Sequence, residues 1–166
     1  MKRQSMIILS AALLLGAVSC RSGKNVVSSA AYSSFETICM GVEGDGSQTL
    51  RVGGKGANKA DAIEQAKKNA VIDVLFKGIA GTGECAQKPL VTEVNARERY
   101  AEYFNPFFSD GGEYRKFVTE ENANDASRLK AQGSSQVNYG IIVTVDREGL
   151  RKQLERDGVL KPVGYR

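Results

Sequence analysis

Apolar residues recur at steps of three and four along residues 58–78, and this spacing predicts an amphipathic helix. Charged residues fall largely on the opposite side. Asn58 is expected to cap the start of the helix and Gly78 to end it. Because the apolar stripe is rich in alanine, we expect the helix to approach a sheet closely. The stripe consists of Ala60, Ile63, Ala66, Ala70, Val71, Val74 and Leu75, and the opposite side of Lys59, Glu64, Lys67 and Lys68.

Strand patterns lie on both sides of this helix in the sequence. Residues 37–42 and 48–53 are separated by a glycine-rich turn segment, which predicts a β-hairpin. In the second of these, apolar and polar residues alternate as in a half-buried strand. Residues 137–145 are apolar and rich in β-branched side chains, so they give the strongest strand prediction in the chain.

The region between the long helix and the last strand is less regular. Residues 79–89 contain several glycines and a proline and predict a loop. A second, shorter helix is expected over residues 93–104, and Asn105-Pro106 is expected to stop it, since a residue before proline avoids helical geometry. Residues 113–118 fit either a strand or a helical turn. Residues 119–136 are polar and are expected to form a loop.

After the last strand, Asp146 is expected to cap a final helix, with Leu150 and Leu154 facing inward and Gly158 at its end. The resulting order of elements predicts an α+β fold. We expect a small antiparallel or mixed sheet with two to three helices packed on one face. The chain without its N-terminal region is long enough for one domain, which we assign to residues 36–166, and too short for two.

The N-terminal region has the organisation of a secretory signal. Lys2 and Arg3 precede an apolar run over residues 6–15, which is shorter than the roughly 20 residues of a membrane span. Cys20 follows directly on small residues. This arrangement resembles the lipobox of Gram-negative lipoproteins, which implies removal of residues 1–19 and acylation of Cys20. The alternative is that Cys20 is incidental and an ordinary signal peptidase cuts nearby.

Residues 20–35 are rich in serine and alanine and predict a flexible tether between the lipid and the domain. Three acyl chains on Cys20 would hold the protein at a membrane far more firmly than one chain does. Arg21 follows the cysteine, so the aspartate that retains lipoproteins in the inner membrane of enteric bacteria is absent. We therefore expect the protein at the outer membrane, on its periplasmic face.

Two cysteines remain once Cys20 is assigned to the lipid. Cys39 and Cys85 are an even remainder in an oxidising compartment, and this pattern favours a disulfide. The alternative is that both are buried thiols that pack as small apolar side chains. The sequence leaves the choice between these two interpretations open.

Charge and composition narrow the function classes. The formal net charge is +4, and it falls to +2 when Lys2 and Arg3 leave with the signal. This mild balance predicts no nucleic-acid partner. The chain contains no histidine, which removes Ser-His-Asp and Cys-His nucleophile systems and every histidine metal ligand. We expect no cofactor, no metal and no catalytic residues.

Two further motifs have weak functional interpretations. Gly54-Lys55-Gly56 lies where a phosphate-binding loop would lie, but the third glycine of that motif is missing. We interpret these glycines as a tight turn between strand and helix, the alternative being an anion at the helix N-terminus. Glu43 and Asp45 are too few oxygens for calcium and predict a solvated turn.

The stretch RVGGKGANKADAIEQAKKNAVIDVLFKGI, a strand ending in glycines followed by an alanine-spaced helix, resembles part of a known family. A late strand, IIVTVD, leads into an amphipathic helix in the same way. The family comprises small Gram-negative envelope lipoproteins whose domain is similar to the N-terminal module of a flagellar assembly protein. The resemblance covers about residues 51–79 and 137–158, and it implies a compact α+β domain in the envelope. It transfers no catalytic residue, and residues 80–136 lie outside it.

Aromatic residues are concentrated between Tyr100 and Phe117, which contain seven of the chain's twelve. One interpretation places Tyr100, Phe104 and Phe108 in the core. The other forms an exposed platform for a partner or glycan; its candidate residues are Tyr103, Phe107, Phe108 and Tyr114. We expect a non-enzymatic accessory module that binds an envelope protein. The alternatives are a lipoprotein that binds glycan or peptidoglycan, and a hydrolase that works without histidine.

Overall fold

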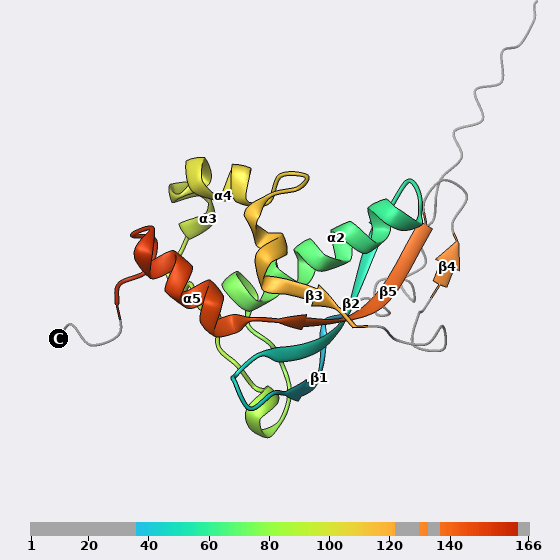
Figure 1. The fold of residues 1–166 in the computed structure, drawn as a ribbon, viewed down its shortest axis with the longest axis horizontal. Coiled ribbons are helices and arrows are strands. Elements are labelled where there is room, and N and C mark those ends of the chain that lie inside the picture. Colours follow the sequence, from blue (N-terminus) through green and yellow to red (C-terminus); the bar gives the residue numbers. More distant parts are fainter. Residues whose placement is uncertain (1–35, 122–129, 133–136, 163–166) are drawn as a thin grey trace, which may run out of the picture.

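A computed structural model describes residues 36–121, 130–132 and 137–162 of the chain. Its centre is a five-stranded antiparallel sheet in the order β1-β2-β5-β3, with β4 also paired to β5 (Figure 1). The strands are β1 (Ile38–Val42), β2 (Gln48–Gly56), β3 (Val118–Glu120), β4 (Lys130–Gln132) and β5 (Val137–Val145). The predicted α+β fold is therefore confirmed. The expected signal, Cys20 and the tether lie outside the described residues.

Helical segments lie mainly on one side of this sheet and beyond the end of β5 (Figure 1). They are α2 (Lys59–Ile72), the π-helix η1 (Asp73–Lys77), the short 3-10 helix η2 (Gly83–Cys85), α3 (Ala96–Arg99), α4 (Ala101–Phe107), the 3-10 helix η3 (Glu113–Phe117) and α5 (Arg147–Arg156).

The two long strands β2 and β5 form the spine of the sheet, and the pattern of their sequences explains why. They pair over their whole length from Gln48↔Val145 to Gly56↔Val137. Residues two apart in a strand share a face, so the pairs Leu50↔Val143 and Val52↔Ile141 lie on the same face, and all four side chains are buried. This is the face that α2 covers.

Small residues bring α2 unusually close to β2. A Cβ atom on Gly54 would overlap the carbonyl oxygen of Ala62 and the backbone nitrogen of Ala66. Gly54 and Gly56 are therefore strand residues that permit close packing, and the expectation that they form the turn is wrong. The inward alanine of the first helical turns is Ala62, whereas Ala60 is exposed. Ala60 fails as a core residue because the helix directs Ala62 toward the glycines.

Both ends of the long helix follow the sequence prediction. The side chain of Asn58 accepts a hydrogen bond from the backbone N–H of Asp61 at 3.1 Å, and Gly78 ends the helical segment with a φ of 79°. The last turn is the π-helix η1. Two of its carbonyl groups are used by the following chain, since the N–H groups of Leu90 and Val91 donate to the carbonyls of Val74 and Leu75. The loop after the helix is thereby bound to its end.

The middle of the chain departs from the sequence prediction in two places, at the expected helix stop and in the expected loop over residues 119–136. The short helical region continues through Pro106 as far as Phe107, so the expected stop at Asn105-Pro106 is wrong. Pro106 has no backbone N–H and therefore removes one helical hydrogen bond. The helix ends one residue later, at Phe107. Residues 113–118 contain a helical turn followed by the start of β3. Short strands, β3 and β4, replace parts of the loop expected over residues 119–136.

The final helix forms as predicted. The side chain of Asp146 accepts a hydrogen bond from the N–H of Gly149 at 2.7 Å, which caps α5. Leu150 and Leu154 are fully buried, and Gly158 follows the helix with a positive φ of 73°. Helix α5 thus closes the end of the core next to η3 and α4 (Figure 1).

Candidate functional site

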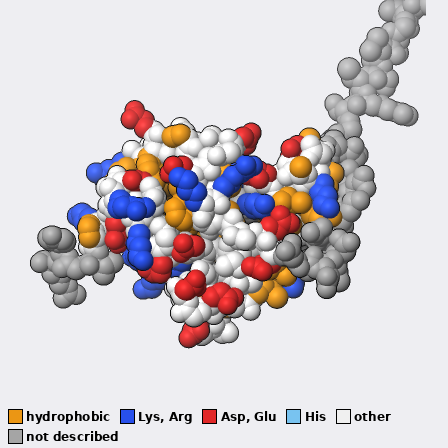
Figure 2. Space-filling model, in the orientation of Figure 1, with side chains coloured by type: hydrophobic (Ala, Val, Ile, Leu, Met, Phe, Trp, Pro, Cys, Tyr) orange, Lys and Arg blue, Asp and Glu red, His pale blue; other side chains and the backbone are white. Residues whose placement is uncertain are grey.

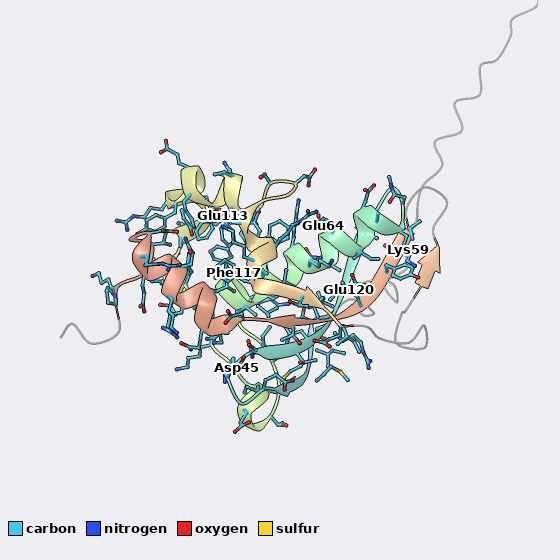
Figure 3. The ribbon with its side chains drawn as sticks, viewed as in Figure 1. Asp45, Lys59, Glu64, Glu113, Phe117 and Glu120 are labelled. Carbon is cyan, nitrogen blue, oxygen red and sulfur yellow. A yellow bond between two sulfur atoms is a disulfide. The ribbon has the colours of Figure 1, made fainter. Side chains whose placement is uncertain are left out.

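Aromatic rings fill the space between the end of α2 and the C-terminal helix. The ring of Phe104 is central, with its centroid 4.9 Å from that of Phe76 and 5.1 Å from that of Tyr103. Edge and stacked contacts connect the remaining rings. The aromatic cluster consists of Phe76, Tyr103, Phe104, Phe107, Phe108, Tyr114 and Phe117. Figure 3 labels Phe117, the member of this cluster that ends η3.

A groove of about 610 Å³ lies on the outer side of this cluster, between α4 and η3. We call it the α4–η3 groove. Its apolar floor is formed by Tyr103, Pro106 and Phe107, and its remaining lining residues are Glu102, Gly111, Gly112, Glu113, Arg115 and Lys116. Figure 2 shows orange apolar side chains between red and blue charged ones over this part of the surface.

Two glycines set the distance between the walls of the groove. Gly111 has a φ of 76°, a conformation that disfavours residues with a Cβ atom. A Cβ on Gly112 would overlap the carbonyl oxygen of Phe107 and lie 2.7 Å from that of Pro106. The close approach of the backbone therefore requires glycine at position 112, and the positive φ favours glycine at position 111.

The prediction of an exposed aromatic platform is wrong for two of its four residues, because their side chains are buried. Phe107 is 3 % exposed and Tyr114 is fully buried, so neither presents a ring face to solvent. Tyr103 and Phe108 are half-buried. The physical reason is that this small domain fills its end with rings, so most of the cluster belongs to the core. Tyr103 and Phe107 still line the α4–η3 groove, the first with part of its ring and the second from beneath.

Tyr103 connects the groove to the C-terminal helix. Its ring stacks on Phe107 at 5.7 Å, and its hydroxyl donates to the Oδ2 atom of Asp157 at 2.7 Å. Burial is the main cause that raises the pKa of Tyr103, and the hydrogen bond and negative charge of Asp157 and the charge of Glu113 raise it further. Asp157 also accepts from the side-chain amide of Gln153 at 2.7 Å.

The charged side chains around the groove differ in whether they have a partner of opposite charge. Lys116 lies 2.7 Å from Glu113, and Arg115 lies 2.7 Å from Glu64 of α2, so each rim cation has a carboxylate partner. Figure 3 shows Glu113 beside α4 and Glu64 on α2. The exposed carboxylate of Glu102 has no cationic partner among residues 36–121, 130–132 and 137–162. The same holds for Asp157, whose recorded partners are neutral donors.

The polar side of α2 holds the outer wall of the groove in place. The hydroxyl of Tyr114 donates to Glu64, and Lys68 lies 2.7 Å from Asp110 in the turn between α4 and η3. Lys67 pairs with Glu120 of β3 at 3.2 Å. Glu64, Lys67 and Lys68, three of the four charged residues predicted opposite the apolar stripe, therefore anchor the segment that follows α4.

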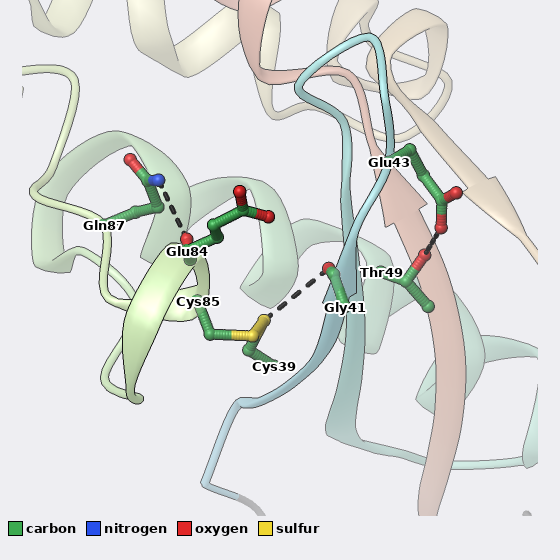
Figure 4. Close-up of a disulfide and its surroundings, with 7 residues drawn as sticks. All are labelled: Cys39, Gly41, Glu43, Thr49, Glu84, Cys85 and Gln87. Atoms are coloured by element: carbon green, nitrogen blue, oxygen red, sulfur yellow. Dashed lines mark hydrogen bonds between the residues drawn. A yellow bond between two sulfur atoms is a disulfide. The ribbon is translucent and has the colours of Figure 1, made fainter.

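Cys39 and Cys85 form a disulfide, so the bonded alternative of the sequence analysis is confirmed. It joins edge strand β1 to η2, with the two Cα atoms 5.7 Å apart (Figure 4). The Sγ atom of Cys39 lies 3.6 Å from the carbonyl oxygen of Gly41. Because a disulfide sulfur carries no proton, this approach is a contact and donates no hydrogen. The bond fixes the strand that directly follows the expected tether.

The carboxylates of the β1–β2 turn are engaged locally, as expected for a solvated turn. Asp45 accepts from the N–H of Ser47 at 2.9 Å, and this hydrogen bond lowers the pKa of Asp45. Glu43 accepts from the hydroxyl of Thr49 at 3.0 Å. Within the described part of the chain, no group of three or more cysteine, aspartate or glutamate side chains is arranged to hold a metal. No described helix has the length and apolar character to cross a membrane.

Sequence reasoning missed the charged rim and one buried cation. Glu102, Glu113, Arg115 and Lys116 form no motif, and only the turn glycines between them hinted that two helical segments meet there. Arg147 is 8 % exposed and donates to the carbonyl of Lys88 at 2.6 Å, which binds α5 to the loop after α2. Burial and the charge of Arg151 lower the pKa of Arg147.

Comparison of the chain with protein-family models, with curated proteins and with solved structures found no match. The resemblance to small envelope lipoproteins therefore stays a prediction from the sequence, and the argument for function depends on the α4–η3 groove itself.

Proposed function

We propose that this chain is a lipid-anchored, non-enzymatic accessory module of the bacterial outer membrane that binds a protein of the envelope through the α4–η3 groove. The observation that carries the proposal is the groove itself. It combines a floor of Tyr103, Pro106 and Phe107 with a rim of charged side chains. Concave sites with an apolar floor and a few polar groups are typical of ligand and peptide binding.

The N-terminal sequence supports the anchored form of this proposal. Acylation of Cys20 followed by a tether over residues 20–35 would hold the domain near a membrane. Confinement of this kind raises the effective concentration of a partner in the same membrane. A groove of this modest size is then sufficient, because the contact does not have to be tight on its own.

The geometry favours a protein partner over a glycan. A sugar-binding platform requires exposed ring faces, and burial removes Phe107 and Tyr114 from that role. The rim instead offers charges of both signs around a narrow apolar floor, as a peptide segment requires.

Photo-cross-linking in intact cells tests the partner. A photoreactive residue at position 116, on the exposed rim of the groove, is expected to yield a discrete adduct with an envelope protein. The matched control places the same residue at position 45, at the exposed tip of the β1–β2 turn, and is expected to yield none of that adduct. Equal labelling from both positions, or none from position 116, would show that the groove is not the binding surface.

Mass spectrometry of the mature protein tests the anchor. The expected N-terminal fragment begins at Cys20 and carries the mass of acyl chains. A Cys20→Ser variant is the control and is expected to lose both the added mass and the membrane fraction. A mature protein with an unmodified N-terminus would overturn the anchored form of the proposal while leaving the groove to be tested by cross-linking.

A further inference from the structure

The arrangement of side chains in the α4–η3 groove indicates the chemistry of its partner, because apolar and charged groups lie at different positions in it. The apolar floor lies where Tyr103 stacks on Phe107, with ring centroids 5.7 Å apart. Phe107 is 3 % exposed and cannot move outward without opening the core. A bound side chain therefore meets the edge of Phe107, the ring of Pro106 and the exposed part of the Tyr103 ring.

The cations around the floor have carboxylate partners, whereas two carboxylates have no cationic partner among the described residues. The rim cations Arg115 and Lys116 already have carboxylate partners at 2.7 Å each. By contrast, Glu102 and Asp157 carry negative charge without a cationic partner among the described residues. Glu102 lines the groove together with Tyr103, and Asp157 accepts a hydrogen bond from the Tyr103 hydroxyl. The unbalanced charge next to the exposed ring is therefore negative.

A cation fits beside Tyr103 for two reasons, the tyrosine ring and the neighbouring carboxylate. A lysine or arginine side chain is attracted to the face of a tyrosine ring, and more strongly when a carboxylate lies nearby. The same arrangement occurs within this protein, where Lys68 lies 5.6 Å from the ring centroid of Tyr114 and 2.7 Å from Asp110. At Tyr103 a ring and a carboxylate are likewise present, whereas the cation–π pairs of the described residues lie at Tyr100, Tyr114 and Tyr139.

We propose that the α4–η3 groove binds an extended segment of the partner protein in which a lysine or arginine lies beside a large apolar residue. The inference rests on the proposed function and specifies the partner of the same site. The apolar side chain would contact Pro106 and Phe107, and the cation would lie between Tyr103 and Glu102. An acidic segment is disfavoured, because it would bring like charge to Glu102 and Asp157.

Selection from a random peptide library tests the partner's chemistry directly. The purified full-length mature protein is immobilised and used to select from displayed twelve-residue random peptides. The expected result is enrichment of peptides that contain lysine or arginine next to a large apolar residue. The most enriched peptide is then synthesised with a fluorescent label, and its affinity is measured by anisotropy.

Matched variants then locate the binding. Glu102→Lys reverses the unpaired charge and is expected to weaken the peptide about tenfold. Glu84→Lys makes the same charge change at an exposed residue of η2, beside the disulfide, and is expected to leave the affinity within about twofold, since separated surface charges are screened. Equal loss in both variants would show a general charge effect and overturn the inference.

The outcomes separate this inference from the proposed function. Enrichment of acidic or uncharged peptides, or of none, would overturn the basic-apolar partner. A cross-linked adduct at position 116 together with such a result would leave the proposed function standing with a partner of different chemistry. Absence of the adduct would instead remove the function on which the inference rests.

Discussion

Around α2, β2 and β5 the closest contacts involve glycine and alanine, whereas around α4, η3 and α5 they involve aromatic rings. In the first region, called here the sheet half, Gly54 brings the backbone of α2 directly over the strand. In the second, the aromatic end, Phe104 contacts the rings of Phe76, Tyr103, Phe107 and Phe108. One region is held by close backbone approach and the other by large side chains.

This difference explains where the candidate site lies. Regular elements packed through small residues leave little room between them. Rings of fixed shape on short helical segments leave gaps, and the α4–η3 groove is such a gap at the surface. The sheet half therefore acts as a support, and the aromatic end forms the surface on which binding is proposed.

The largest effect is expected at the centre of the aromatic end. Phe104→Ala removes a ring that is 1 % exposed and should lower the free energy of unfolding by about 4 kcal/mol, because a cavity remains among four other rings. Phe104→Leu, which fills part of the space, should cost about half as much. Urea denaturation followed by circular dichroism measures both. Equal losses would show that the volume of the cavity does not determine the cost.

The disulfide gives the next largest effect, and it acts on the edge of the sheet half. A Cys39→Ala, Cys85→Ala double variant should lose about 3 kcal/mol of stability, because the bond closes a separation of 46 residues and restricts the unfolded chain. Either single variant should lose about the same amount, since each removes the same bond. Denaturation without reductant measures the three proteins, and a markedly smaller loss in the double variant would contradict the explanation.

Close backbone approach in the sheet half is tested by Gly54→Ala. The added Cβ would overlap backbone atoms of Ala62 and Ala66, which cannot rotate away, so we expect a loss of about 2 kcal/mol. Gly44→Ala is the matched control, because a Cβ there meets nothing within 4 Å. Thermal unfolding compares the two variants. A similar change in both would mean that the helix shifts to accommodate the methyl group.

The two regions also differ in how far their sequences predicted them. Helix α2, strand β5 and helix α5 follow periodic patterns with recognisable caps, and each forms where expected. The aromatic end has no period. Its elements are short, α4 runs through Pro106, and burial of Phe107 and Tyr114 is decided by contacts between distant segments.

The candidate site was therefore predicted only in part. The concentration of aromatic residues pointed to the correct segment, but it did not distinguish a ring in the core from a ring at the surface. Tyr103 and Asp157 are 54 positions apart, and only the completed fold brings them within hydrogen-bond distance. The disulfide was one of two open alternatives, because the distance between two cysteines depends on the completed fold.

The smallest effect concerns Tyr103, which joins the groove to α5. Burial, together with the charge of Asp157, raises the pKa of its hydroxyl above the usual value of 10.0. A group with a raised pKa in the folded state contributes stability that is complete below its unfolded pKa. That contribution is lost as the pH rises through the folded pKa. The wild-type protein should therefore lose stability above about pH 10.

Absorbance at 295 nm measures the pKa of Tyr103, because it follows ionisation of tyrosine. Tyr103→Phe should remove a late-ionising hydroxyl and cost about 1 kcal/mol or less at neutral pH. Asp157→Asn should keep the hydroxyl but lower its pKa, because the negative charge is lost while burial remains. If Asp157→Asn left the titration unchanged, the negative charge of Asp157 would not act on the ring. The basic side chain proposed for the partner would then depend on Glu102 alone.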